Sequence, residues 1–341
     1  MDTMLTSKFS LPAELDSFIS TDQCGADAVM CFYNGELVPQ NSHFDERVQL
    51  QTNTLFAQLD VRAGGEKPFR VSVVELYGNQ LGAQRQEPFA VSCRHHYHIQ
   101  NKAEIIETHI ALNEIAFTIN NASSFELDEG ATADYAQTYW VGDVATVNNK
   151  VQSRLRANSQ MNGLMLNVGS EQIRNNLNVD LAAQGAKARL QALVLATNEH
   201  QIETVSHIRH LAPETKSEQL VKSVINKSAR FSFTGHIEIA KKAQKSDASQ
   251  LSQNLLLSRE GTVKTEPQLD VGADDVKATH GATVGQLDES QLFYLTSRGV
   301  PRADARNILA LAYQRDVLER LKRGFVRNHI EKIHARFAGG G

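Results

Sequence analysis

Short extended runs fill most of the chain between residues 54 and 276 and recur roughly every ten to fifteen residues. No long helical pattern lies between them. Three of these runs, at residues 190–195, 220–225 and 255–257, are rich in apolar residues. This spacing predicts a mainly β protein. Apolar and polar residues alternate, as in strands with one buried face, in Phe69-Arg70-Val71-Ser72-Val73, Phe231-Ser232-Phe233 and His236-Ile237-Glu238-Ile239.

Two architectures fit this spacing. One is a β-sandwich or jelly roll, whose strands are connected mainly by hairpins. The other is a β-helix, in which each coil of short strands stacks on the previous one. The sequence has no strict period, which a regular β-helix would show, and few hairpin signals after Asn34-Gly35, which a sandwich would need. Periodicity alone therefore leaves both architectures open.

Different patterns flank the β region. Residues 1–24 are expected to form an N-terminal arm with a short helix at residues 12–19, because Pro12 suits the first turn of a helix. Asn34-Gly35 between apolar runs predicts a hairpin. We therefore expect an arm at residues 1–24, a β domain at residues 25–286 and a helical subdomain at residues 287–341.

The C-terminal segment changes to a helical pattern at Asp288, which can cap a helix together with Gln291 three residues on. Gly299 suits the end of this helix, and Pro301 suits the start of a second one, which Gly324 is expected to interrupt. Helices in this place can cap the last coil of a solenoid. One face of the second helix is expected to be mostly apolar, and it comprises Ile308, Leu311, Ala312, Arg315, Leu318 and Leu321.

The composition argues against several classes of protein. A net charge of −4 offers no basic excess for nucleic acid, and no apolar run is long enough to span a bilayer. Residues 1–20 lack the basic start and the long apolar stretch of a signal peptide. Cys24, Cys31 and Cys93 form neither a disulfide scaffold nor a zinc-site spacing, so we expect them to be small hydrophobes. These features predict a cytoplasmic protein.

The sequence motifs of common enzymes are absent. The sequence has no phosphate-binding loop, dinucleotide fingerprint, Gly-x-Ser-x-Gly elbow or His-Glu-x-x-His helix. A β-helical carbohydrate-active enzyme would need paired carboxylates and aromatic platforms, and only 6% of the residues are aromatic. A structural solenoid is a further alternative. The sequence therefore predicts a protein that is not an enzyme.

A small, glycine-punctuated stretch at residues 274–285 surrounds His280 and leads directly into the expected helix. This junction resembles the SufB/SufD family of the SUF iron–sulfur cluster assembly system. It resembles the SufD type, because Gly281 stands where SufB carries a glutamate. Weaker similarity extends over most of the chain, back to Tyr33-Asn34-Gly35-Glu36-Leu37-Val38-Pro39. The specific matches are Pro267-Gln268-Leu269, residues 273–277 and 280–285, Leu292-Phe293-Tyr294-Leu295 and Ser297-Arg298-Gly299.

The resemblance implies a right-handed parallel β-helix with a short N-terminal arm and a C-terminal α-helical subdomain. It implies a scaffold subunit that pairs with a SufB-like chain and docks the SufC ATPase to build and transfer iron–sulfur clusters. A transient cluster at the interface with SufB and reduced flavin in the complex are the cofactors it implies. Family members usually have a longer helical N-terminal region. The sequence leaves open whether the isolated chain is a monomer or a homodimer.

His280 is the candidate metal ligand and the candidate residue of the cluster-assembly interface. An imidazole can bind iron or zinc and replaces cysteine in some clusters, although a structural histidine bonded to the backbone is the alternative. In SufD-like proteins the matching histidine is implicated in cluster assembly at the interface with SufB. Ala278 stands where many of them carry cysteine, so thiolates are expected from SufB. The ATPase-docking candidates are Leu292, Phe293, Tyr294, Arg298, Gly299 and Val300.

Two other histidine groups have a structural interpretation. In a strand, His96 and His98 point to one face and His95 to the other, and a two-histidine edge is a weak ligand set. A solvated sheet face is therefore expected there. His207 and His210 are also expected on a polar outer face, where stacked coils would bring them near Lys222 or Glu238.

Overall fold

The computed structural model describes residues 26–34, 36–38, 42–43, 45–53, 56–65, 67–78, 88–112 and 116–339. The expected N-terminal arm at residues 1–24, its helix at residues 12–19 and Cys24 lie outside the described residues.

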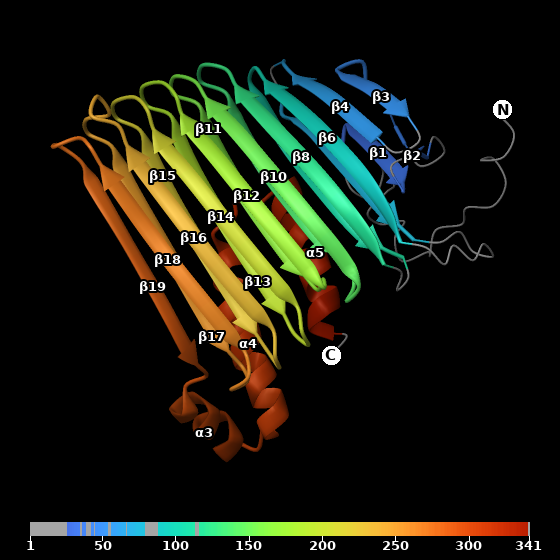
Figure 1. Ribbon diagram of the computed structural model, residues 1–341, viewed down its shortest axis with the longest axis vertical. Coiled ribbons are helices and arrows are strands. Elements are labelled where there is room, and N and C mark those ends of the chain that lie inside the picture. Colours follow the sequence, from blue (N-terminus) through green and yellow to red (C-terminus); the bar gives the residue numbers. More distant parts are fainter. Residues whose placement is uncertain are drawn as a thin grey trace, which may run out of the picture.

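Two long sheets run side by side along the molecule and are joined at every turn of the chain (Figure 1). Strands with odd numbers form one sheet, called sheet A here, and strands with even numbers form sheet B, apart from the edge strands β2 and β3. Sheet A consists of β1 (Ala28–Tyr33), β2 (Glu36–Leu37), β5 (Phe69–Tyr77), β7 (Lys102–Ala111), β9 (Thr132–Trp140), β11 (Gln160–Val168), β13 (Lys187–Ala196), β15 (Lys216–Ile225), β17 (Asp247–Leu256) and β19 (Lys277–Gln286).

Sheet B has the same construction, and each of its strands from β4 onward pairs in parallel with the strand one turn later. The architecture is a parallel β-solenoid of about seven turns, which confirms the β-helix and excludes the sandwich. Sheet B consists of β3 (Val48–Asn53), β4 (Phe56–Ala63), β6 (Phe89–Ile99), β8 (Phe117–Leu127), β10 (Ala145–Leu155), β12 (Gln172–Leu181), β14 (Gln201–His210), β16 (Arg230–Ile239) and β18 (Thr262–Val271).

The repeat is real but irregular in length and in sequence. Thr146 pairs with Gln172, 26 residues on, and Arg230 pairs with Thr262, 32 residues on, so the turns differ in length. The left-handed corner that precedes each of the strands β11, β13, β15 and β17 is filled by a different residue type: Asn158, Gly185, Glu214 and Lys245 all have positive φ. A constant backbone shape with changing residues and lengths explains why no strict period is visible in the sequence.

The hairpin predicted at Asn34-Gly35 is confirmed. Strand β1 pairs antiparallel with β2, and Tyr33 faces Glu36. Asn34 has a φ of 50°, as the two-residue turn of such a hairpin requires. Strand β3 likewise pairs antiparallel with β4, so antiparallel strands finish the N-terminal edge of both sheets.

Three helices follow β19: α3 (Glu289–Ser297), α4 (Arg302–Glu319) and α5 (Phe325–Gly339). The predicted start of α3 is confirmed, because the Asp288 side chain accepts a hydrogen bond from the backbone N–H of Ser290. Its end is a Schellman turn: Gly299, at φ +89°, donates to Thr296 O, and Val300 donates to Leu295 O. Gly324 lies in the loop between α4 and α5.

Helices α4 and α5 lie across the outer face of sheet A, behind the strands in Figure 1, and do not cap the last turn. The expectation of an end cap is therefore wrong. The physical reason is a second apolar layer, because sheet A buries leucines on its outer face as well as its inner one. Val317 and Ile330 pack there, with Leu164, Leu193 and Leu220.

The predicted apolar face of α4 is correct only in part. Leu318 is buried and Leu321 packs against the outer core, but Ile308 is 46% exposed, and Ala312 and Arg315 are exposed. The buried residues of the helix are Ala305, Ala310, Gln314, Val317 and Leu318. The sequence did not predict this face because one of its buried residues is a glutamine. Gln314 can be buried since its Oε1 forms a hydrogen bond of 2.7 Å with Nε2 of His334 on α5.

The C-terminal end of the solenoid is open. Strands β18 and β19 pair with the preceding turn, and no strand covers their other edge within the described residues. Side chains that would be interior in a longer solenoid are consequently exposed, with Val271 at 43% and Val284 at 47%. Figure 1 shows β19 as the bare last strand of the stack.

Because one isoleucine of the helical layer is buried and another is half exposed, truncating them should have different effects on the free energy of unfolding. Ile330→Ala should lower the free energy of unfolding by about 3 kcal/mol, because it opens a cavity under α5. Ile308→Ala should change it by less than about 0.5 kcal/mol, because that side chain is half exposed. Urea unfolding of both variants tests this, and an equal loss in both would contradict the packing of α4 described above.

Candidate functional site

His280 lies on β19 at the open end and faces the interior of the solenoid. In the parallel register it is paired with Gln250 of β17, and Gln250 is paired with Gln219 of β15. Both glutamines are buried, whereas His280 is exposed because no further turn covers it. The histidine is thus an interior residue laid open at the end of the stack.

Ala278 and Ala282 share this inward face with His280, because side chains alternate along a strand. Ala278 packs against the main core, so a cysteine in its place would lie beside His280 on the same surface. Among the described residues, no group of three or more His, Cys, Asp or Glu side chains is arranged to hold a metal ion. His280 can therefore offer one ligand, and the others would have to come from another chain.

The ATPase-docking candidates divide into two kinds on α3. Phe293 and Tyr294 are exposed by 73% and 57%, and the guanidinium of Arg298 lies 5.1 Å from the centre of the Tyr294 ring. Leu292 is buried and anchors the helix, so it is not available to a partner in this arrangement. Gly299 and Val300 form the Schellman turn beside them.

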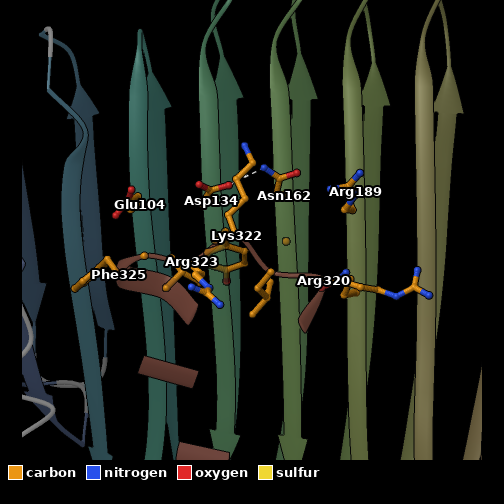
Figure 2. A pocket seen from close by; sticks show the side chains of 14 residues that line it. Glu104, Asp134, Asn162, Arg189, Arg320, Lys322, Arg323 and Phe325 are labelled. Atoms are coloured by element: carbon orange, nitrogen blue, oxygen red, sulfur yellow. Dashed lines mark hydrogen bonds between the residues drawn. The ribbon is translucent and has the colours of Figure 1, made fainter. Parts of the chain in front are cut away.

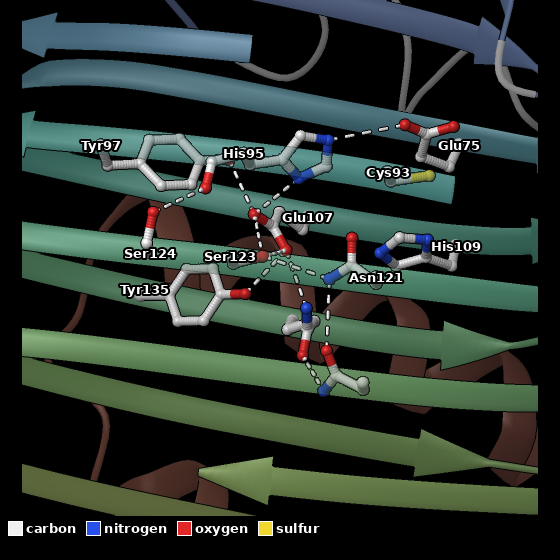
Figure 3. Close-up of polar contacts among 12 residues, drawn as sticks. Glu75, Cys93, His95, Tyr97, Glu107, His109, Asn121, Ser123, Ser124 and Tyr135 are labelled. Carbon is white, nitrogen blue, oxygen red and sulfur yellow. Dashed lines mark hydrogen bonds and ion pairs between the residues drawn. The ribbon is translucent and has the colours of Figure 1, made fainter. Parts of the chain in front are cut away.

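A buried polar network fills the interior near the other end of the solenoid and centres on Glu107 of β7 (Figure 3). Its two carboxylate oxygens accept hydrogen bonds of 2.7–2.9 Å from the side chains of Tyr97, Ser123, Tyr135 and Gln137. His95 Nδ1 lies 3.0 Å from Oε1 of Glu107, and its Nε2 lies 3.6 Å from Glu75. His95 thus points to the face opposite His96 and His98, as strand alternation predicts, and that face is the buried interior.

The charges in this network are set by its partners. Burial would by itself raise the pKa of Glu107, but the His95 imidazolium and the hydrogen bonds lower it to about 2. Burial would lower the pKa of His95, but Glu107 and Glu75 raise it to about 9. Burial keeps the pKa of Glu75 above its ordinary range. His95 and Glu107 are therefore a buried ion pair at neutral pH.

Polar side chains continue from this pair along the solenoid axis. Gln137 accepts from Asn149 at 2.7 Å, and Asn149 belongs to a ladder on sheet B. Near the open end, Gln219 Oε1 accepts hydrogen bonds from Ser206 and Gln250. The ladder on sheet B runs through Asn121, Asn149, Asn175 and Thr204, with side-chain bonds of 3.1–3.2 Å between successive turns.

Comparison with known proteins identifies the family. The model of the SUF system FeS cluster assembly SufBD core domain matches residues 86–313, which is more than half of the chain. The chain belongs to the SufBD family.

Its relatives support the SufD type. The chain is 29% identical over 271 residues to the iron–sulfur cluster assembly protein SufD of Escherichia coli, covering 76% of this chain and 62% of that protein. It is 31% identical over 188 residues to the SufBD family protein slr0076 of Synechocystis, covering 55% and 40%. SufD of Plasmodium berghei is 26% identical, with coverage of 70% and 18%. The chain thus spans less than two thirds of the length of each of these relatives.

The histidines of the two other groups in this SufBD protein, His96 with His98 and His207 with His210, contact partners on or directly beside neighbouring strands. His96 and His98 lie on the outer face, as expected, and bond to Ser124 and Asp128 at 2.9 Å. His207 also lies outside, 3.3 Å from Glu238, as the stacking of coils predicted. His210 is buried instead, since Thr215 and Ser217 satisfy its two ring nitrogens at 2.8 Å.

Cys31 and Cys93 are buried, and burial raises the pKa of the Cys31 thiol to about 12, so both behave as small hydrophobes. A small hollow lies under the loop between α4 and α5, where Figure 2 shows Lys322 and Arg323 near Asp134 and Arg320 toward Arg189. Its volume of about 30 Å³ leaves room for little more than water.

No described helix combines the length and apolar character needed to span a membrane.

Removing the charge of Glu107 should be costly. Glu107→Gln leaves the buried His95 charge without its main partner, and we expect a loss of about 3 kcal/mol in the free energy of unfolding. Glu104→Gln is the matched control, because Glu104 lies on the same strand but pairs with the half-exposed Arg70 on the outer face. That control should lose less than about 1 kcal/mol. Similar losses of unfolding free energy in both variants would show that the interior ion pair contributes no more to stability than the surface one.

Stability should peak near pH 6.5. The pKa of His95 is raised from 6.5 to about 9, so its contribution is complete below pH 6.5 and is lost as pH rises through 9. Burial lowers the pKa of His329 on α5 from 6.5 to about 3, so its contribution is complete above 6.5 and is lost as pH falls toward 3. Unfolding free energies measured across this range should decline on both sides, and His329→Gln should reduce the decline on the acid side only.

Proposed function

We propose that this chain is a scaffold subunit for iron–sulfur cluster assembly that pairs with a SufB-like chain through the open end of its solenoid. The observation that carries the proposal is the position of His280, which faces the interior yet is exposed at the last, uncovered turn. Membership of the SufBD family supports the assembly role. A second solenoid stacked on this end would bury the exposed strands and bring its own residues next to His280.

The edge strands are suited to such pairing. A free strand edge offers a row of unpaired N–H and C=O groups, which a partner strand can satisfy. Strand β19 is ten residues long and contains no proline, whereas β18 carries Pro267, which cannot donate. We therefore assign the main partner contact to β19. A second copy of this chain is the alternative occupant, which would give a homodimer.

In this arrangement His280 supplies one imidazole to a transient cluster, which is the cargo of the complex. Thiolates come from the SufB-like chain, because Ala278 provides none here. The chain itself would act as a scaffold and not as a catalyst. We assign the reduced flavin to the complex and to no residue of this chain.

We further propose that α3 docks a SufC-like ATPase. Phe293 and Tyr294 form an exposed aromatic patch, and Arg298 gives it a charged rim, which is the usual composition of an interface. Helix α3 follows β19 directly, so a partner that moves α3 acts next to the open end. ATP could then favour one arrangement of the paired subunits, since a ligand acts only through its different affinity for two states.

A carbohydrate-active enzyme receives no support from the surface of the strands. The exposed large aromatic residues among the described residues are Phe293 and Tyr294, and both lie on α3. Glu75 and Glu107 form the carboxylate pair of the interior, where a polysaccharide cannot reach them. We therefore retain the assembly role. Mixing the purified chain with SufB-like and SufC-like proteins is its first test, because the two rival functions require no such complex.

Substitutions on α3 should weaken binding to the ATPase and leave the β domain folded. Tyr294→Ala or Arg298→Glu should raise the dissociation constant by roughly 30-fold, because central aromatic and arginine residues carry most of an interface's energy. The control is Arg154→Glu, the same change at an exposed position on the outer face of sheet B. Calorimetry with folded variants measures this, and unchanged affinity for both α3 variants would rule out this docking surface.

His280 should matter for cluster content and not for assembly of the subunits. His280→Ala should leave complex formation intact but lower the iron and sulfide content after reconstitution, because one ligand is lost. Ala278→Cys should be tolerated and retain cluster at least as well, since it adds a thiol on the same face. His236→Ala, an outward histidine on β16, is the control. If His280→Ala matches the unaltered protein in cluster content, the histidine is structural.

A further inference from the structure

The side-chain oxygen of Gln250, the residue paired with His280, is a hydrogen-bond acceptor without a donor. Its side-chain nitrogen donates to Gln219 Oε1 at 2.7 Å, toward the interior of the stack. Its own oxygen, Oε1, is buried and has no hydrogen-bond partner. A buried carbonyl without a donor is costly, so a donor is expected near it.

The neighbours of Gln250 leave few donors for this oxygen. The position of a Cβ at Gly235, across the interior, would lie 2.4 Å from Gln250 Nε2, so the amide packs directly over this glycine. Gly235 is paired with Pro267 on β18, and neither residue has a side-chain donor. On the open side, the residue paired with Gln250 is His280, whose imidazole carries an N–H.

The direction of the amide supports the same partner. The two heteroatoms of a carboxamide diverge from one carbon, so the nitrogen that points to β15 turns the oxygen away from β15. The hydroxyl of Thr265 on β18 is a second buried group without a partner, and it is the competing donor.

We infer that Gln250 is the positioning residue of His280: its side-chain oxygen accepts the N–H of one ring nitrogen and leaves the other nitrogen free at the open end. A carbonyl that receives one N–H of a histidine fixes the tautomer and the ring orientation, as it does for histidines that bind metals. The chain Ser206–Gln219–Gln250 in turn holds the amide, because Ser206 and Gln250 both donate to Gln219 Oε1. This inference rests on the proposed function for its purpose, but its geometry concerns the isolated chain alone.

Nitrogen-15 NMR of the histidine rings in the isolated full chain tests it without any partner or cluster. The unaltered protein should show one neutral tautomer of His280, favoured by roughly tenfold, as one hydrogen bond allows. Gln250→Met keeps the length of the side chain but removes the acceptor, and both tautomers should then be populated. Thr265→Val, which removes the competing donor, should leave the His280 signals unchanged.

Two results would overturn the inference. One is a mixture of tautomers in the unaltered protein, which needs no variant to fold. The other is a single tautomer that survives Gln250→Met. Cluster content of the reconstituted complex is measured separately with His280→Ala, so a failure of the proposed function appears there and not in the tautomer ratio.

Discussion

Parallel backbone hydrogen bonding between successive turns is the constraint on which the rest of this structure depends. Each strand from β5 to β17 is paired on one side with the previous turn and on the other with the next. Such a stack has no natural end, because its last turn always leaves one edge without partners. At the N-terminal side the short antiparallel strands β2 and β3 finish the sheets. At the C-terminal side the edge stays open, and this places His280 where another chain can reach it.

The interior of the stack contains buried polar side chains beside its apolar core. The buried Glu107–His95 pair and the ladder through Asn149 replace apolar packing over several turns. Networks of this kind add little net stability over an apolar core, but each unpaired member would be costly, so they favour one register of the turns. The position of Gln250 beneath His280 depends on that register, since a shift by one residue would turn both side chains outward.

The sequence predicted the parts of this fold that rest on local chemistry. Alternation along the strands, the turn at Asn34-Gly35, the cap at Asp288 and the end of α3 at Gly299 were all predicted correctly. What the sequence could not show depends on pairing between turns. Alternation along the strand places His95 opposite His96 and His210 opposite His207, but which of the two faces is interior depends on the neighbouring turns. The buried face of α4 was missed for a related reason, because Gln314 becomes a core residue only when His334 faces it.

The site was predicted only in part. His280 was chosen from its setting among small residues and from the family resemblance, and the structure adds that it faces the interior of an open end. The central claim is that this end is where a partner binds. Hydrogen–deuterium exchange of the chain, alone and mixed with a SufB-like protein, tests it most directly. The account predicts new protection concentrated in β19 and, more weakly, β18, with the outer face of sheet B unchanged. Protection confined to the outer faces, with β19 exchanging as fast as before, would contradict it.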